Sequence, residues 1–120
     1  MTDVRIAPHT DAAADRLIRT LEAHGLTARS DIDVHTGTDM VTVDIAGGPE
    51  IWIADRTGHT DSPVDAHPGW VAFYRPHAGL SDEGETEVYR SEGTGGFSQD
   101  TAALVVAVVQ CAAARGLAAV

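Results

Sequence analysis

The sequence contains no lysine and no asparagine, and Cys111 is the single cysteine among its 120 residues. One cysteine excludes an intramolecular disulfide and fits a reducing cytoplasm. Without lysine, all eight basic side chains are arginines. We interpret this bias, together with abundant Ala, Asp, Gly, Val and Thr, as the codon preference of a high-GC bacterial genome.

Positive charge is scarce. Eight arginines face 18 acidic residues, which gives a formal net charge of −10. Such a surface repels nucleic-acid backbones and anionic lipid, so we expect no direct binding to nucleic acid and no membrane association. An acidic surface serves solubility, and it also attracts a basic protein partner.

The sequence also lacks a clear targeting or membrane segment. Met1 to Thr10 is polar and does not show the basic-then-apolar pattern of a signal peptide, so we expect a cytoplasmic protein. Thr101 to Val120 is apolar, but it is rich in alanine and interrupted by Gln110 and Gly116. A membrane span needs about 20 strongly apolar residues, and a buried helix is therefore the better interpretation.

Hydrophobic periodicity predicts two terminal helices that flank five strands. The first helix is expected from Thr10, as N-cap, to His24, with a Schellman ending at Gly25 and Leu26. The last helix is expected to begin near Ser98 and to end at Gly116. The expected strands are Thr27 to His35, Met40 to Ala46, Glu50 to Asp55, Trp70 to Arg75 and Thr86 to Arg90.

This order, α-β-β-β-β-β-α, predicts a single α+β domain over residues 1–120. We expect a two-layer sandwich, in which an antiparallel sheet of about five strands carries both helices on one face. The element order resembles that of small adaptor and secretion-chaperone-like folds, although those folds usually place a helix within the sheet. We carry no function over from that resemblance.

The aromatic residues of the third and fourth strands suggest a contact surface. By alternation, Trp52, Trp70 and Tyr74 lie opposite Ile51, Ile53, Val71 and Phe73. If these four line the core, the three aromatic side chains form an exposed cluster for a partner. With the opposite phase, the tryptophans belong to the core, and alternation alone leaves both possibilities open.

An acidic run surrounds the fifth strand and includes Glu85 and Glu87. Charged edge strands usually protect a sheet from pairing with another sheet. The alternative is a docking surface for a basic partner.

The segment from His59 to His67 contains two imidazoles and two carboxylates, His59, Asp61, Asp65 and His67. These ligand types suit a divalent transition metal, although no helix or strand fixes their spacing. The alternative is a solvated loop, because Ser, Thr, Asp and Pro are typical turn formers.

No nucleophile elbow, P-loop or helical zinc motif is present, and Cys111 lies within an apolar helix. We therefore expect a non-enzymatic binding or adaptor protein without a cofactor, acting through Trp52, Trp70, Tyr74, Glu85 and Glu87. The Ala103, Ala107 and Ala114 face of the last helix suggests a homodimer. The alternative function is a metal- or small-ligand-binding protein that uses the histidine loop.

Overall fold

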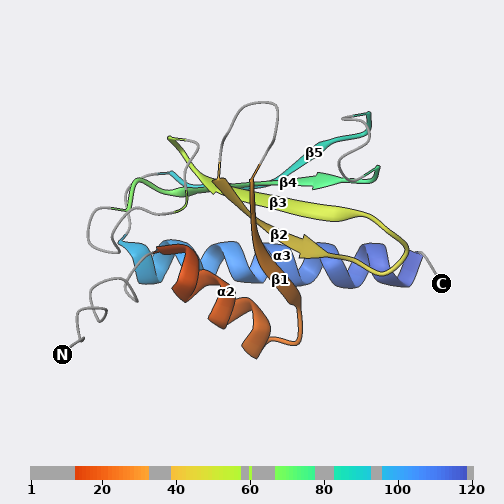
Figure 1. Cartoon of the computed structure of the whole chain (residues 1–120), viewed down its shortest axis with the longest axis horizontal. Helices are drawn as coiled ribbons and strands as arrows, with labels where there is room; N and C mark the ends of the chain where they lie inside the picture. Colours follow the sequence, from red (N-terminus) through yellow and green to blue (C-terminus); the bar gives the residue numbers. More distant parts are fainter. Residues whose placement is uncertain are drawn as a thin grey trace.

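A computed structural model describes residues 13–32, 39–57, 60, 67–77, 83–92 and 96–118, except for the side chains at 32 and 115–118. Five antiparallel strands form one sheet, with a helix before and a helix after them. The chain therefore has the α+β fold that the sequence predicts, with both helices on one face of the sheet (Figure 1).

The strands follow one another across the sheet in chain order, so the sheet is a simple meander. Three strands have the predicted bounds, and β2 differs from its prediction by one residue at its start and two at its end. The first strand begins at Thr27 as predicted, and the last three residues predicted for it, 33–35, lie outside the described residues. Consecutive antiparallel pairing agrees with the short connection between β2 and β3, whereas longer segments, 56–69 and 76–85, join β3 to β4 and β4 to β5. The strands are β1 (Thr27–Ile32), β2 (Asp39–Asp44), β3 (Glu50–Asp55), β4 (Trp70–Arg75) and β5 (Thr86–Arg90).

Helix α2 (Ala13–Ala23) packs on β1 and β2 through a narrow apolar stripe that includes the fully buried Leu17 and Leu21. Its expected N-cap, Thr10, lies outside the described residues. The predicted Schellman ending is confirmed. The Leu26 amide donates to the Leu21 carbonyl at 3.1 Å, and Gly25 has a φ of 83°, a conformation that favours glycine.

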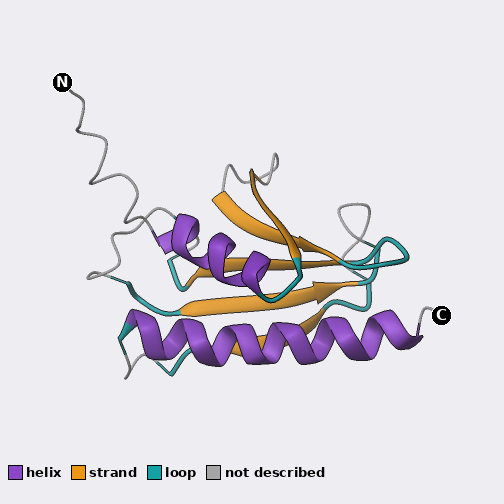
Figure 2. Cartoon of the chain, turned by 90° about the horizontal axis from the view of Figure 1, so that it is seen from below, coloured by secondary structure: helices purple, strands orange, loops and turns teal. Residues whose placement is uncertain are grey.

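Helix α3 (Phe97–Ala118) packs on β4 and β5 through the buried Leu104, Val105 and Val108. Figure 2 shows α2 and α3 side by side across the same face of the sheet. The Asp100 amide donates to the Gly96 carbonyl at 3.0 Å, so Gly96 starts the helix and Ser98 lies within the first turn. The expectation that Ser98 caps α3 is therefore wrong.

The segment Phe97–Ala114 of α3 is long and apolar enough to cross a membrane by length and composition, with a mean hydropathy of 1.4. It is the one such helix within the described part of the chain. A core helix of a soluble protein meets the same criteria. Of this segment, 28% is buried, including Leu104, Val105 and Val108, which pack on the core, so much of α3 is exposed in the isolated chain.

The phase of β4 follows from its pairing with β3. Ile51 and Ile53 are fully buried on the helix-covered face, and their partners are Tyr74 and Ala72. Cross-strand partners share a face, so Trp70, Ala72 and Tyr74 point toward the helices. The other phase, with Trp70 and Tyr74 on the outer face, is wrong. Every residue from Trp70 to Tyr74 is apolar or aromatic, so the pattern of β4 carries little information on phase.

Candidate functional site

Trp52 is the one member of the expected aromatic cluster that lies on the outer, helix-free face of the sheet. Its cross-strand neighbours there are Thr42 on β2 and Phe73 on β4. Trp52 and Phe73 are both partly exposed. In contrast, Trp70 is fully buried and Tyr74 is 8% exposed, so neither contributes to an outer surface.

Neighbouring side chains hold the Trp52 indole in place. Its Nε1–H donates to Glu50 Oε1 at 2.8 Å. The Arg75 guanidinium lies 4.0 Å from the ring centroid, which is a cation–π distance. Arg75 also pairs with Glu85 at 3.0 Å, which fixes the guanidinium from its other side. The indole is thus fixed both at its edge and over its face.

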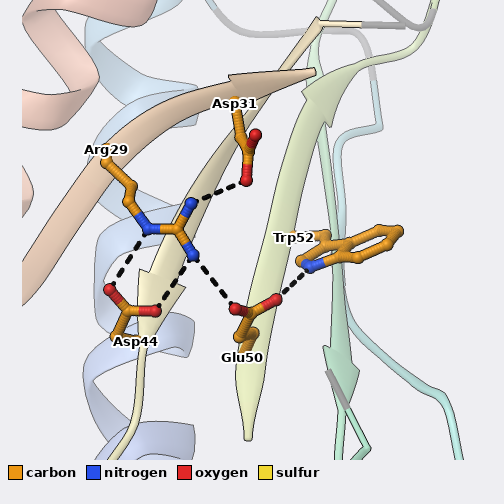
Figure 3. Close-up of polar contacts among 5 residues, drawn as sticks. All are labelled: Arg29, Asp31, Asp44, Glu50 and Trp52. Atoms are coloured by element: carbon orange, nitrogen blue, oxygen red, sulfur yellow. Dashed lines mark hydrogen bonds and ion pairs between the residues drawn. The ribbon is translucent and has the colours of Figure 1, made fainter. Parts of the chain in front are cut away.

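A network of charges continues from Trp52 across the sheet to its first strand (Figure 3). Arg29 donates to Asp31 at 2.6 Å, to both oxygens of Asp44 at 3.3 Å, and to Glu50 at 3.0 Å. The hydrogen bonds to Asp44 and then to Asp31 raise the pKa of Arg29. Glu50 joins this arginine to Trp52, so one connected network spans β1 to β3.

The two predicted acidic contact residues both have basic partners. Glu85 pairs with Arg75, and Glu87 pairs with Arg90 at 2.8 Å. Glu85 lies close to Trp52, because Arg75 contacts both side chains. Glu87, on β5, lies opposite Phe73 on β4. The acidic edge therefore includes ion pairs as well as acidic side chains. This arrangement could not be inferred from the acidic run alone.

A buried polar cluster at the start of α3 was not anticipated from the sequence. The Asp100 carboxylate accepts hydrogen bonds from His67 Nε2 at 2.8 Å, the Trp70 amide at 2.8 Å and the Tyr89 hydroxyl at 2.5 Å. Trp70 Nε1 donates to the Thr101 hydroxyl at 2.9 Å. An acidic residue in the first turn of a helix usually serves the positive end of the helix dipole, yet the Asp100 carboxylate turns toward the sheet.

The cluster shifts the pKa of two of its members. Burial alone would raise the pKa of Asp100, but the hydrogen bonds from Tyr89, His67 and the Trp70 amide outweigh it, so this pKa is lowered. The pKa of Tyr89 is raised to about 12, first by burial and then by its hydrogen bond to the Asp100 carboxylate. At neutral pH the cluster therefore contains an ionised aspartate and a neutral tyrosine.

His67 is the described member of the expected metal set. Its side chain is 2% exposed and packs between Trp70 and Phe97, with ring centroids 4.5 and 5.2 Å away. Its Nδ1 is buried and has no hydrogen-bond partner among the described residues. The other three members, His59, Asp61 and Asp65, lie outside those residues. Within the described ranges, no three potential ligands lie close enough to hold a metal.

The expected self-association face lies on α3. Ala103 and Ala114 are exposed, Ala107 is half-buried, and the nearby Val106 is 55% exposed. Cys111 is a partly buried thiol, outside any disulfide, on the side of α3 that packs on the core.

Comparison with protein-family models, curated proteins and solved structures finds no match to this chain.

Proposed function

We propose that this protein is a non-enzymatic, cytoplasmic adaptor that binds another protein through the outer face of its sheet. The observation that carries the proposal is the partly exposed Trp52, fixed by Glu50 and Arg75 on the face opposite both helices. Trp and Arg are enriched at protein contact surfaces and dominate their binding energy. A side chain that is already fixed loses little conformational entropy on binding.

The charges of this face favour a partner with basic groups. Carboxylates outnumber guanidiniums around Trp52, so the face keeps a negative balance after its ion pairs are formed. Such a balance steers a basic partner toward the face and repels an acidic one. The groups are Asp31, Asp44, Glu50, Glu85 and Glu87 against Arg29, Arg75 and Arg90.

Site-specific photo-crosslinking in living cells tests the proposal. A photoreactive residue replaces Ala54, which lies two residues from Trp52 on the same face of β3. The matched control replaces the exposed Ala113 on α3. We expect one protein to crosslink at position 54 and not at 113, and Trp52→Ala to abolish that product.

Equal crosslinking from both positions, or a product that survives Trp52→Ala, would contradict the outer face as the binding surface. Trp52 is partly exposed, so its replacement should leave the fold intact, and circular dichroism of the variant verifies this. A crosslink between two copies at position 113 would instead support the homodimer through the Ala103, Ala107 and Ala114 face.

A second candidate function, binding of a divalent transition metal, is favoured by the geometry of His67. Metal-bound histidines usually donate their other ring N–H to a carboxylate, which sets the tautomer. The 2.8 Å contact of His67 Nε2 with Asp100 has this arrangement, and it leaves Nδ1 as a lone-pair donor. We propose that His67 binds the metal together with His59, Asp61 and Asp65.

Calorimetric titration with Zn²⁺ tests this second candidate. Binding should be lost in the His59→Ala, His67→Ala double variant and retained in His24→Ala. The His24 ring lies at the end of α2, bonded to the Thr20 carbonyl, and serves as a control histidine. Equal zinc binding by all three proteins would remove the histidine loop as the metal site.

A further inference from the structure

The two helices enclose a groove that no part of the proposed function uses. It lies between α2 and the first turns of α3, on the helix side of the sheet, and has a volume of about 570 Å³. Figure 2 shows the two helices side by side there. Arg16, Arg19 and Thr20 line one wall, and Phe97, Ser98 and Ala102 line the other.

The groove concentrates positive charge in an acidic protein. Arg16 and Arg19 are exposed and form no ion pair with any described residue, whereas Arg29, Arg75 and Arg90 are all paired. No described carboxylate lines the groove. Arginine guanidiniums bind phosphate or carboxylate groups through several hydrogen bonds, and two of them line one wall of this groove.

The nearest acidic groups do not neutralise this site. Asp15 and Glu22 lie on α2 but outside the groove lining. Asp100 lies in the first turn of α3, but its oxygens accept hydrogen bonds from Tyr89, His67 and the Trp70 amide. Asp15 and Glu22 lie about one turn of α2 from these arginines and reduce the local positive potential, but no described carboxylate forms an ion pair with either guanidinium. The local arginines therefore determine whether an anion binds.

The opposite wall combines polar and apolar groups. Ser98 has an exposed side chain in the first turn of α3, where backbone N–H groups lack partners within the helix. Phe97 and Ala102 form an apolar surface beside it. A ligand that fills the groove therefore has an anionic end for the arginines and an apolar body for this wall.

We propose that the groove binds a small organic phosphate monoester, with Arg16 and Arg19 contacting its phosphate group and Phe97 contacting its organic part. A phosphate dianion matches two guanidiniums in charge. This site is independent of Trp52 and of His67, so it can be tested while both proposed functions are left intact.

The test is titration of the full chain with phenyl phosphate and, in parallel, with inorganic phosphate. Calorimetry measures affinity, and NMR amide shifts locate the site. We expect phenyl phosphate to bind more tightly than inorganic phosphate and to shift the amides of Arg16, Arg19 and Ser98. Loss of charge-assisted hydrogen bonds in the Arg16→Gln, Arg19→Gln variant should weaken binding by about tenfold or more.

The matched control is Arg56→Gln, which removes an exposed arginine that does not line the groove. It should bind phenyl phosphate as the wild type does. Thermal unfolding verifies that both variants fold, since all three arginines are exposed. No binding to the wild type, or equal loss in the control, would overturn the proposal. Equal affinity for phenyl phosphate and inorganic phosphate would overturn the proposed contact of Phe97 with the organic group.

Discussion

The Asp100 carboxylate accepts a hydrogen bond from the Trp70 amide at 2.8 Å, so a side chain of α3 holds the first residue of β4. The same carboxylate binds Tyr89 on β5 and His67 just before β4. One buried anion thus connects a helix, two strands and the segment that leads into one of them. Three of the predictions below follow from this connection.

Replacement of Asp100 by Asn should destabilise the fold by about 2–4 kcal/mol, because one acceptor oxygen and the charge are lost at a buried site. Urea unfolding at neutral pH measures the change. The control is Asp15→Asn, because Asp15 is exposed in the first turn of α2. This variant should lose at most about 1 kcal/mol of unfolding free energy. Similar losses in both variants would contradict the role of Asp100.

The same variant should alter acid unfolding. The pKa of Asp100 is lowered in the folded protein, so its stabilising contribution is present above the unfolded-state pKa of about 3.9. That contribution is lost as the pH falls through the lower, folded-state pKa. Stability of Asp100→Asn should therefore depend less steeply on pH in this acidic range than stability of the wild type.

Alkaline titration should distinguish Tyr89 from an ordinary tyrosine. The pKa of Tyr89 is raised to about 12, so the stability that its neutral form contributes is fully present below pH 10. It is lost as the pH rises from about 10 to about 12. The tyrosinate absorbance of the wild type minus that of Tyr89→Phe should give a midpoint near pH 12. A midpoint near 10 would contradict the buried hydrogen bond to Asp100.

The two tryptophans should differ in fluorescence. Trp70 is fully buried, so Trp52→Phe, which leaves Trp70 as the emitter, should emit at short wavelength and resist acrylamide quenching. Trp70→Phe leaves the partly exposed Trp52, whose emission should be red-shifted and quenched more readily. The reverse pattern would contradict the observed phase of β4.

Two glycines allow a matched test of packing at the start of β4. Gly69 and Gly48 have φ values of +115° and +111°, but a Cβ at Gly69 would lie 2.7 Å from Ser91, while one at Gly48 meets nothing within 4 Å. Both alanine variants carry the cost of positive φ. Gly69→Ala should be the less stable variant by about 1–3 kcal/mol in urea unfolding. Equal losses would exclude the close approach of Gly69 to Ser91.

The fold could be predicted from this sequence because its local patterns are clear. The apolar stripe of α2, the glycine ending at Gly25 and the alternation in β3 each specify one local structure. In β4 both faces are apolar, so only pairing with Ile51 and Ile53 determines which face is buried. The Asp100 cluster joins residues up to 33 positions apart, and no local pattern indicates such a contact.

The position of α3 after all five strands has a consequence for synthesis of the chain. Proteins begin to fold from the N-terminal side while they are synthesised, and each strand of this meander pairs with the strand made just before it. However, the face of β4 and β5 stays uncovered until α3 emerges, which leaves Trp70, Ala72 and Tyr74 in contact with water. During that interval the nascent chain presents the kind of apolar surface that chaperones recognise, and completion of α3 removes it.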